Sequence, residues 1–339
     1  MPVPEFILYL TESDVQQTLK MAEAVDLAEK GIQADASGRV AGDKFYMAVG
    51  EAGFIKPFSG YLLGENLAFV KTFCFFPGNP AQFGCSTTSS LVLLFDAETG
   101  LLVCLMEGGW VTALKTGAST AVTAACLACS NSATVTIFGA GMLGRMHLRA
   151  LTHRFSLRQA YVVDILPQAA AAYVAELEPE LDFPVESVPL ADREWAVRQA
   201  DIIITVTTGA QPLVERAWLL PGAFVARLGS YQEIALDVII DADKVVVDNW
   251  HYVRPRIPEL KVLGQEGRFG FEDVHAEWPD VVAGRRPGRE SPDELIVYIA
   301  LGIWGEYAAI LPEVYRRARG LGLGHRLPQS IGHSTSLVT

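Results

Sequence analysis

Short apolar runs alternate with helical stretches from Ala133 to about residue 250. The runs, rich in Val, Ile and Phe, have the length of strands, and segments with helical periodicity separate them. Strands that alternate with helices are typical of a parallel sheet covered on both faces. The runs lie in "ATVTIFG", "QAYVVD", "FPVESV", "ADIIITVTT", "GAFVARLG" and "DKVVVDN". The pattern predicts the α/β class, with a doubly wound parallel sheet of the Rossmann type.

The first third of the chain contains longer extended runs. A strand, "FILYL", precedes a helix that is expected to start at Thr11, where Asp14 would complete a capping box. In "SLVLLFDAETGLLVCLMEGG" two apolar runs flank a turn with Asp and Gly, which predicts a hairpin. The other β-rich runs are "KFYMAVG", "GFIKPFSGYLL" and "NLAFVKTFCFFPG". We expect an antiparallel sheet with one leading helix, followed by a helix that carries Lys115.

The chain ends in a long apolar segment and a polar tail. Residues 293–320 are expected to form one amphipathic helix that packs back on the N-terminal domain. The predicted substrate-binding and dimerisation domain is α+β and comprises residues 1–118 and 295–339. The predicted NAD(P)-binding Rossmann domain comprises residues 119–294. The tail from Pro328 is expected to be disordered.

Composition narrows the classes of partner. Charged residues make up 19% of the chain, below the roughly 25% that is usual. This shortage predicts a buried subunit interface, and hence a homodimer formed through the N-terminal sheet. The net charge of −12 argues against nucleic acid and membrane partners, because phosphate groups need a basic face. Cys126 and Cys129 form a C-x-x-C without a second pair, so no metal site is predicted; the scattered cysteines suggest a cytoplasmic location.

A glycine-rich turn follows the first strand of the predicted parallel sheet, in "TVTIFGAGMLGRMHLRAL". Gly139 would make the turn, Gly141 would let the backbone approach a pyrophosphate, and Gly144 would let helix and strand pack closely. The helix N-terminus then offers N–H groups and its dipole to the phosphates. A second strand ends at Asp164, where a carboxylate would accept hydrogen bonds from the adenosine ribose. Together these features predict a dinucleotide site.

Asp164 also favours NAD over NADP. Its charge would oppose a 2′-phosphate, and the residues that follow, Ile165 to Pro167, offer no arginine. Thr207 and Thr208 end a later strand at the edge where ligands bind, although threonines at strand ends are also common without a ligand. The predicted cofactor-binding residues are Thr116, Gly139, Ala140, Gly141, Met142, Leu143, Gly144, Asp164, Val206, Thr207, Thr208 and Gly229.

Three lysines lie in apolar or β-rich segments: Lys44, Lys71 and Lys115. Lys115 is the single charge in "GGWVTALKTGASTAVTAACLAC", and a buried ammonium without a partner is costly. Cations that converge beside the nicotinamide would bind a substrate carboxylate strongly. The alternative is that each lysine is solvated, with Lys115 extending to the surface. If Lys115 instead binds substrate, Lys115→Met should remove that contact and leave folding nearly intact.

Six segments occur in a fixed order along the chain: "FVKTFCFFPGN", the hairpin and helix through "GWVTALKTGAS", "IFGAGMLG", "VTTGAQPLV", "FVARLGSYQ" and "DVVAGRRPGRESPDELIVYIALG". Their order resembles the ornithine cyclodeaminase/mu-crystallin family along almost the whole chain. The resemblance implies a Rossmann domain and a dimerisation domain. It also implies a small amino or imino acid substrate whose carboxylate is bound by Lys44, Lys71 and Lys115.

The chain departs from the family pattern at two places. Lys115 replaces an arginine and therefore lacks the planar, two-pronged grip of a guanidinium. Cyclodeaminases carry an aspartate after the fifth Rossmann strand, where "LGSYQEIALD" has Ser230 and Tyr231, with Glu233 nearby. The second departure argues against the cyclodeaminase reaction and leaves fold and cofactor unaffected.

The leading functional hypothesis is an NAD(P)-dependent imine reductase or amino-acid dehydrogenase. Hydride would pass between the nicotinamide and the substrate α-carbon. Lys71 and Lys115 are the candidate catalytic residues, and Lys71 would protonate nitrogen or stabilise developing charge. The alternatives are a cyclodeaminase that recycles NAD within one turnover, and a non-catalytic ligand-binding protein of the mu-crystallin type.

Overall fold

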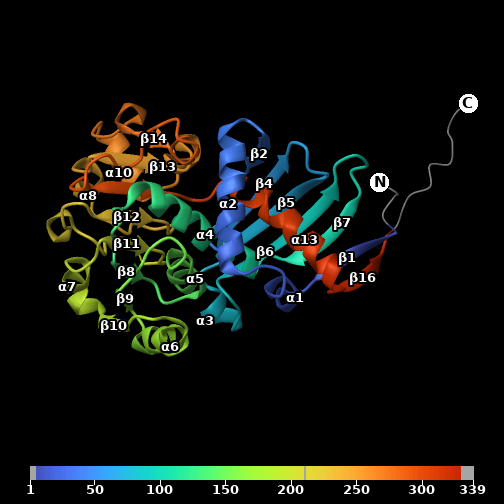
Figure 1. Cartoon of the computed structure of the whole chain (residues 1–339), viewed down its shortest axis with the longest axis horizontal. Coiled ribbons are helices and arrows are strands. Elements are labelled where there is room, and N and C mark those ends of the chain that lie inside the picture. Colours follow the sequence, from blue (N-terminus) through green and yellow to red (C-terminus); the bar gives the residue numbers. More distant parts are fainter. Residues whose placement is uncertain (1–4, 210, 330–339) are drawn as a thin grey trace, which may run out of the picture. The chain divides into compact units, whose positions relative to one another are not determined.

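The structure, a computed structural model, describes residues 5–209 and 211–329 and divides the chain into two units (Figure 1). The first unit contains residues 1–20, 40–112 and 308–339, and the second contains residues 21–39 and 113–307. An eight-stranded sheet forms the framework of each unit.

The sheet of the second unit is parallel and contains the six predicted strands and two more. Its order is β10-β9-β8-β11-β12-β15-β13-β14, and its first five positions have the 3-2-1-4-5 order of a Rossmann fold, counted from β8. The predicted α/β class and Rossmann-type sheet are confirmed. The strands are β8 (Thr134–Phe138), β9 (Gln159–Asp164), β10 (Val185–Pro189), β11 (Ile202–Thr205), β12 (Phe224–Arg227), β13 (Lys244–Val247), β14 (Ala276–Glu277) and β15 (Ile296–Ile299).

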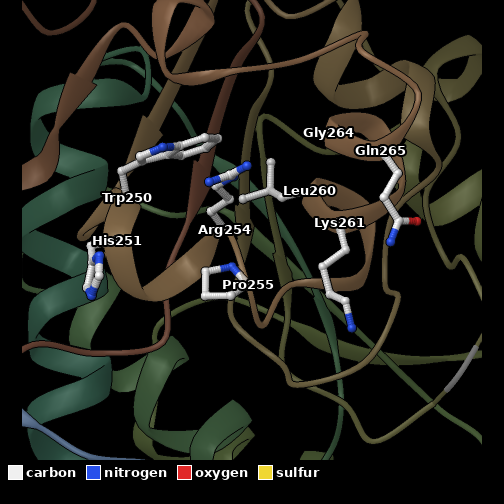
Figure 2. Close-up of a pocket in the computed structure, with 8 residues that line it drawn as sticks. All are labelled: Trp250, His251, Arg254, Pro255, Leu260, Lys261, Gly264 and Gln265. Atoms are coloured by element: carbon white, nitrogen blue, oxygen red, sulfur yellow. The ribbon is translucent and has the colours of Figure 1, made fainter.

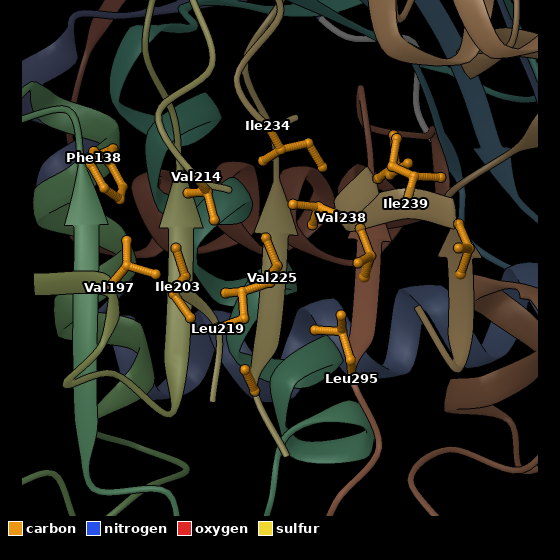
Figure 3. Packing of buried hydrophobic residues seen from close by; sticks show 14 of the residues in the cluster. Phe138, Val197, Ile203, Val214, Leu219, Val225, Ile234, Val238, Ile239 and Leu295 are labelled. Atoms are coloured by element: carbon orange, nitrogen blue, oxygen red, sulfur yellow. The ribbon is translucent and has the colours of Figure 1, made fainter. Parts of the chain in front are cut away.

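Helices cover both faces of this parallel sheet. Every residue of β11, β12, β13 and β15 is buried, which requires packing on both sides. On one face, Ile203 and Val225 pack in a cluster with Val238 and Ile239 of α8 (Figure 3). The helices of this unit are α2 (Met21–Ala36), α4 (Gly109–Leu127, which begins in the first unit), α5 (Met142–Leu151), α6 (Pro167–Leu177), α7 (Arg193–Val197), α8 (Leu236–Ile240), α9 (Trp250–Val253), α10 (Pro258–Gln265), α11 (Trp278–Val282) and α12 (Gly305–Ala308).

One predicted helix begins as a strand. The prediction of a single helix over residues 293–320 is wrong, because its first part is β15, which lies between β12 and β13 in the parallel sheet. The four residues Ile296–Ile299 are all buried. An apolar run that is buried on every side has no polar stripe, so its periodicity does not distinguish a strand from a helix.

The sheet of the first unit is mostly antiparallel, in the order β16-β1-β7-β6-β5-β4-β2, with β3 paired to β4. The exception is β1, which is parallel to β7; β16 then pairs antiparallel with β1. The predicted run "KFYMAVG" is divided between β2 and β3. The strands are β1 (Phe6–Leu10), β2 (Val40–Lys44), β3 (Met47–Val49), β4 (Gly53–Leu62), β5 (Leu67–Phe75), β6 (Thr88–Asp96), β7 (Leu102–Glu107) and β16 (His325–Pro328).

Two local predictions in the first unit are confirmed. Thr11 caps α1 (Glu12–Gln16), and the Asp14 carboxylate in turn accepts a hydrogen bond from the Thr11 N–H at 2.9 Å. In the hairpin of β6 and β7, Asp96 accepts hydrogen bonds from the N–H groups of Glu98 and Thr99. The remaining helices are α3 (Asn79–Phe83) and α13 (Ile310–Leu321), and α13 belongs to this unit.

The boundaries of the units differ from the predicted domain boundaries of 1–118, 119–294 and 295–339. The helix α2 belongs to the second unit because it packs against α5 and α11. Strand β15 belongs there because it hydrogen-bonds within the parallel sheet. The tail that was expected to be disordered from Pro328 lies mostly outside the described residues, and Pro328 itself pairs with Phe6.

Candidate active site

The glycine turn between β8 and α5 leaves the N-terminus of α5 open. Gly139 has a φ of 108°, where a side chain would be strained. A Cβ on Gly144 would lie 2.0 Å from the carbonyl oxygen of Gly139, so the close packing at this turn requires glycine. Apart from Gly141 itself and its neighbours in the chain, no described atom lies within 4 Å of where a Cβ on Gly141 would be, and no described side chain caps α5. This open space and the free N–H groups at the start of α5 fit the pyrophosphate of a dinucleotide.

Asp164, the last residue of β9, lies beside the glycine turn. Its carboxylate accepts hydrogen bonds from the N–H groups of Ala140 at 2.8 Å and Leu166 at 2.9 Å. The apolar side chains of Ile165 and Leu166 are 77% and 51% exposed. The carboxylate is therefore held at the strand end where an adenosine ribose would bind, and the next residues offer no cation for a 2′-phosphate.

The loops that follow β11 and β12 meet at the buried carboxylate of Glu233. It accepts hydrogen bonds from the Thr207 N–H at 2.6 Å, the Thr207 hydroxyl at 2.9 Å and the Thr205 hydroxyl at 2.9 Å. It also accepts one from the Gly229 N–H at 2.7 Å. The hydroxyl proton of Thr207 is thus held within the protein, whereas Thr208 is exposed.

Glu259 on the helix α10 holds the loop that follows β12 in place. Burial raises the pKa of Glu233, an effect that the nearby Arg227 opposes. Arg227 is fully buried and forms an ion pair with Glu259, with 3.1 Å between Nη2 and Oε2. Glu259 also accepts hydrogen bonds from the N–H groups of Glu233 at 2.9 Å and Ile234 at 3.3 Å. Neither Arg227 nor Glu259 was identified from the sequence.

Lys115 lies in the second turn of α4 and is buried, so the alternative that it extends to the surface is wrong. Its Nζ lies 2.6 Å from Oε2 of Glu306 and 4.6 Å from the ring centroid of Tyr307. Burial alone would lower the pKa of Lys115, but the carboxylates of Glu306 and Asp248 help to raise it above its ordinary value. Lys115 is therefore charged, and its anion here is a protein carboxylate that the sequence analysis missed.

Gly302 leaves room for this ion pair beside the loop that follows β15. It has a φ of 81°, and a Cβ there would lie 2.9 Å from Nζ of Lys115. Glu306 is further oriented by the Ile303 N–H, which donates to Oε2 at 2.7 Å. Burial, and then the charge of Lys115, lower the pKa of His147 on α5 to about 3. Lys115 thus acts on a residue of the helix that starts at the glycine turn.

Asp35 lies near the same ion pair, and its environment can be tested by the pH dependence of folding stability. Burial raises the pKa of Asp35 from 3.8 to about 6, against the effect of its hydrogen bond from the Trp304 indole. The folded chain binds this proton more tightly than the unfolded chain, so the stabilising contribution is full below about pH 4 and is lost as the pH rises through about 6. Asp35→Asn keeps an acceptor for Trp304, and we expect it to be more stable than the wild type at neutral pH, with a smaller difference near pH 4. Urea unfolding across this range measures the difference, and an equal gain at both ends would contradict the assignment.

Strand register places Lys44 and Lys71 on one face of the first unit's sheet. Lys44 of β2 pairs with Phe58 of β4, and Phe58 pairs with Lys71 of β5. Residues that pair directly across strands share a face. The row continues through Val92 and Met106, and both lysines are buried, with 7% and 1% of their surfaces exposed. Two buried ammonium groups therefore share this face with the apolar side chains of Phe58, Val92 and Met106.

Aromatic rings surround these ammonium groups. The Nζ atoms of Lys44, Lys71 and Lys56 lie 5.6, 5.3 and 5.1 Å from the ring centroid of Phe58. Lys71 and Lys56 also lie 5.2 and 5.3 Å from the centroid of Phe73. Ring faces attract cations, so the aromatic side chains help to hold three positive charges close together. Lys56 was not predicted, although it lies two residues before Phe58 on the same strand face.

The predicted site residues fall into two groups. Lys44 and Lys71 share a face of the first unit, and Lys115 lies in the second unit; their convergence on one substrate stays a prediction. The second unit also carries the predicted cofactor-binding residues of α4, of the glycine turn and of the strand ends, including Thr116, Met142, Leu143 and Val206.

Among residues 5–209 and 211–329, no three His, Cys, Asp or Glu side chains are grouped to hold a metal ion. Within those ranges, no helix combines the length and the apolar character needed to cross a membrane.

The profile of the ornithine cyclodeaminase/mu-crystallin family matches residues 7–321 of the chain. An N-((2S)-2-amino-2-carboxyethyl)-L-glutamate dehydrogenase from Staphylococcus aureus is 30% identical over 253 residues, which cover 74% of each protein.

Two solved structures share the fold along almost their whole length. One is the Δ1-pyrroline-2-carboxylate reductase of Thermococcus litoralis in complex with NADH and L-proline, with a TM-score of 0.89 and 28% identity. The match covers 94% of this chain and 99% of that one. The other is an archaeal alanine dehydrogenase dimer with bound NAD, with a TM-score of 0.87, 28% identity, and coverage of 96% and 99%.

Proposed function

The chain belongs to the ornithine cyclodeaminase/mu-crystallin family, and we propose that it is an NAD-dependent oxidoreductase that acts on a small amino or imino acid. The main support for this proposal is the pairing of Lys44 and Lys71 with Phe58, one on either side of it. Both lysines are buried on the same face of the sheet. Buried ammonium groups that lie close together on one sheet face favour an anionic ligand, because an ion pair gains strength where water is excluded. An amino or imino acid offers a carboxylate of suitable size.

The second unit has the residues to hold the cofactor. The turn from Gly139 to Gly144 would bind the pyrophosphate, and Asp164 would accept hydrogen bonds from the adenosine ribose. NAD is favoured over NADP by Asp164 and by the NADH and NAD in the two related structures. When bound, the nicotinamide supplies or accepts hydride at the α-carbon of the substrate.

The lysines have distinct proposed roles. Lys44 and Lys71 bind the substrate carboxylate, and Lys71 also donates a proton to the substrate nitrogen or stabilises charge that develops there. Lys115 contributes a third positive charge, which Glu306 holds in place. The tight ion pair with Glu306 reduces the net charge that Lys115 offers, so we assign Lys44 and Lys71 the larger share of carboxylate binding.

A cyclodeaminase is disfavoured by the loop after β12. Glu233 is the single acid among residues 228–236, and its carboxylate is buried and accepts four hydrogen bonds. It is therefore committed to holding the loop and is not available to receive a proton from substrate. Ser230 and Tyr231 stand where the family aspartate would lie, and neither side chain has a carboxyl group.

Cofactor stoichiometry tests the proposed function. NADH oxidation is measured with keto acids and an amine, and with preformed cyclic imino acids such as pyrroline-2-carboxylate. Net NADH consumption supports the proposal. Ammonia release from a diamino acid without net change in NADH would instead indicate a cyclodeaminase, and binding of NADH without either reaction would indicate a ligand-binding protein.

Asp164→Ala is expected to weaken NADH binding by about 10- to 100-fold, as is usual when a charged hydrogen-bond acceptor is removed. It should also reduce discrimination against NADPH, because the carboxylate no longer opposes the 2′-phosphate. Fluorescence titration with both cofactors measures these changes. Asp182→Ala, at an exposed site in the same unit, serves as the matched control. Equal wild-type affinity for the two cofactors, unchanged in Asp164→Ala, would contradict the assignment.

We also propose that the chain forms a homodimer through the outer face of the first unit's sheet. Side chains alternate between faces along a strand, so Leu91 lies opposite the face of Val92 and Lys71. Leu91 is 46% exposed, and Val70 and Leu93 on the same outer face are half-buried. An apolar sheet face of this kind is typical of a subunit interface. The related alanine dehydrogenase is a dimer.

Leu91→Asp tests this interface. Light scattering is expected to give a dimer for the wild type and a monomer for Leu91→Asp, because an uncompensated charge would be buried at the contact. Leu63→Asp is the matched control, since Leu63 is 50% exposed and lies outside the sheet, just after β4. A wild-type monomer at micromolar concentration, or a dimer that survives Leu91→Asp, would rule out this face.

A further inference from the structure

A hollow of about 540 Å³ opens between α9 and α10 in the second unit (Figure 2). Its eight lining residues come from these two helices and from the turn that joins them. The volume is within the range of small-molecule sites, which is roughly 300–1,000 Å³. Nothing in the proposed oxidoreductase mechanism uses this hollow.

The hollow is basic although the chain has a net charge of −12. His251, Arg254 and Lys261 line it, and none of its described lining residues is acidic (Figure 2). The acids closest in sequence to Lys261 are engaged elsewhere: Glu259 is buried against Arg227, and Glu266 pairs with Arg268 at 2.9 Å. Among the described residues, no carboxylate forms an ion pair with Arg254 or Lys261, so their charges are left to a ligand or to solvent.

An apolar wall completes the hollow. Trp250 and Leu260 line it, and Leu260 is almost fully buried. The indole of Trp250 is supported by Phe269 and Phe271, whose ring centroids lie 6.2 and 6.1 Å away. The backbone N–H of Trp250 donates to Glu277 at 2.8 Å, which anchors the start of α9. The wall is thus formed before any ligand arrives, which reduces the entropy lost on binding.

The hollow is separate from the predicted dinucleotide site. The glycine turn follows β8, whereas α9 follows β13. In the sheet order β8-β11-β12-β15-β13, the two strands are four positions apart, which is roughly 19 Å at about 4.8 Å per strand. A dinucleotide bound to the turn at Gly139 would place its adenosine end at Asp164 on β9, on the side of β8 away from β13. Its nicotinamide end would lie near the predicted contacts Thr207 and Gly229, which follow β11 and β12, and none of these predicted contacts lines the hollow.

We propose that this hollow binds a small organic anion with a planar or apolar body. Its phosphate or carboxylate groups contact Arg254 and Lys261, with His251 as a further donor, and its body lies against Trp250 and Leu260. Arginine and lysine bind both kinds of acidic group by charge-assisted hydrogen bonds, and aromatic faces accept planar ligands. The site is suited to a regulatory ligand or to part of a second substrate. Ligand binding there does not require hydride transfer at the nicotinamide.

The same helix connects this hollow to the loop that carries Gly229. On α10, Lys261 faces the hollow, while Glu259 holds the backbone of Glu233 and Ile234. A ligand that restrains α10 therefore acts on a helix that also positions the strand-end loops.

Calorimetric titration with adenosine 5′-monophosphate and with isophthalate tests the proposal, the first for phosphate and the second for carboxylate. Titrations are made without and with saturating NADH, and uncharged adenosine is the control ligand. We expect at least one anion to bind both in the absence and in the presence of NADH, and adenosine to bind more weakly. The double variant Arg254→Gln/Lys261→Gln should weaken anion binding at least about tenfold while leaving the melting temperature unchanged. Arg268→Gln, an exposed arginine paired with Glu266, is the matched control and should bind as the wild type does.

Three results would overturn the proposal. They are failure of both anions to bind up to about 10 mM, equal affinity in the wild type and the double variant, and displacement of the anion by NADH. Because binding is measured directly, each of these results is distinct from a failure of the proposed oxidoreductase activity, which the NADH-oxidation assay reports.

Discussion

Lys115→Met is expected to lower the free energy of unfolding by about 3–5 kcal/mol, the usual cost of removing one partner from a buried ion pair. The side chains of Lys115 and Glu306 are each only 4% exposed, so the variant would leave the Glu306 carboxylate buried without its cation. This expectation replaces the one drawn from the sequence, in which the substitution left folding nearly intact. Urea unfolding monitored by fluorescence measures the change.

The double variant Lys115→Met/Glu306→Gln separates the structural role of Lys115 from a role in substrate binding. The introduced amide would keep an acceptor for the Ile303 N–H and remove the uncompensated charge, so most of the lost stability should return. If Lys115 also binds the substrate carboxylate, kcat/KM stays reduced by roughly 30-fold to several thousand-fold, equivalent to about 2–5 kcal/mol. If Lys115 is structural, activity returns together with stability.

Lys30→Met is the matched control for these variants. Lys30 is an exposed lysine on α2 in the same unit, and its substitution should change stability by less than about 0.5 kcal/mol. A Lys115→Met protein as stable as Lys30→Met would show that the ion pair with Glu306 contributes little to folding.

Glu259→Leu is expected to destabilise the second unit by about 3–5 kcal/mol. The substitution leaves the guanidinium of Arg227 buried without its carboxylate, at a site where both side chains are 0% exposed. It also removes the acceptor for the N–H groups of Glu233 and Ile234. Because the loop that carries Gly229 loses this support, NADH affinity should fall as well. Thermal or urea unfolding and an NADH titration measure the two effects.

Glu266→Leu, just after the same helix, is the control for Glu259→Leu. Its carboxylate is exposed and pairs with Arg268 at the surface, and such pairs contribute about 0–1 kcal/mol. Similar losses in the two variants would mean that the effect arises from α10 in general. An unchanged NADH affinity in a folded Glu259→Leu protein would show that the loop does not depend on this helix.

The parallel sheet and the glycine turn could be predicted because their signals are local. Each of the six strands from β8 to β13 is a short apolar run between helical segments, and Gly139, Gly141 and Gly144 are adjacent to one such strand. The capping box of Thr11 and Asp14 is likewise contained within four residues. Each of these features depends on residues that are close together in the chain, so the spacing of those residues in the sequence is sufficient to predict it.

Features that depend on contacts between distant residues were missed. β15 forms a strand because β12 and β13 leave a position between them, and no pattern within Ile296–Ile299 specifies that position. The partner of Lys115 is 191 residues away. A usable signal existed, however: Glu306 is the single charge in residues 295–312, just as Lys115 is in its own apolar segment. Two isolated charges of opposite sign in apolar segments would have predicted a buried pair.

The late position of β15 in the chain has a consequence for protein synthesis. Its two neighbours in the sheet, β12 and β13, are translated first, and roughly 50 further residues must follow before Ile296 emerges to join them. At about 5–20 residues per second, the inner edges of β12 and β13 are without their native partner for several seconds. Both strands are buried along their whole length in the folded chain, so these edges are open to pairing with other chains. The nascent second unit is therefore exposed to aggregation until a strand from near the end of the chain fills the sheet.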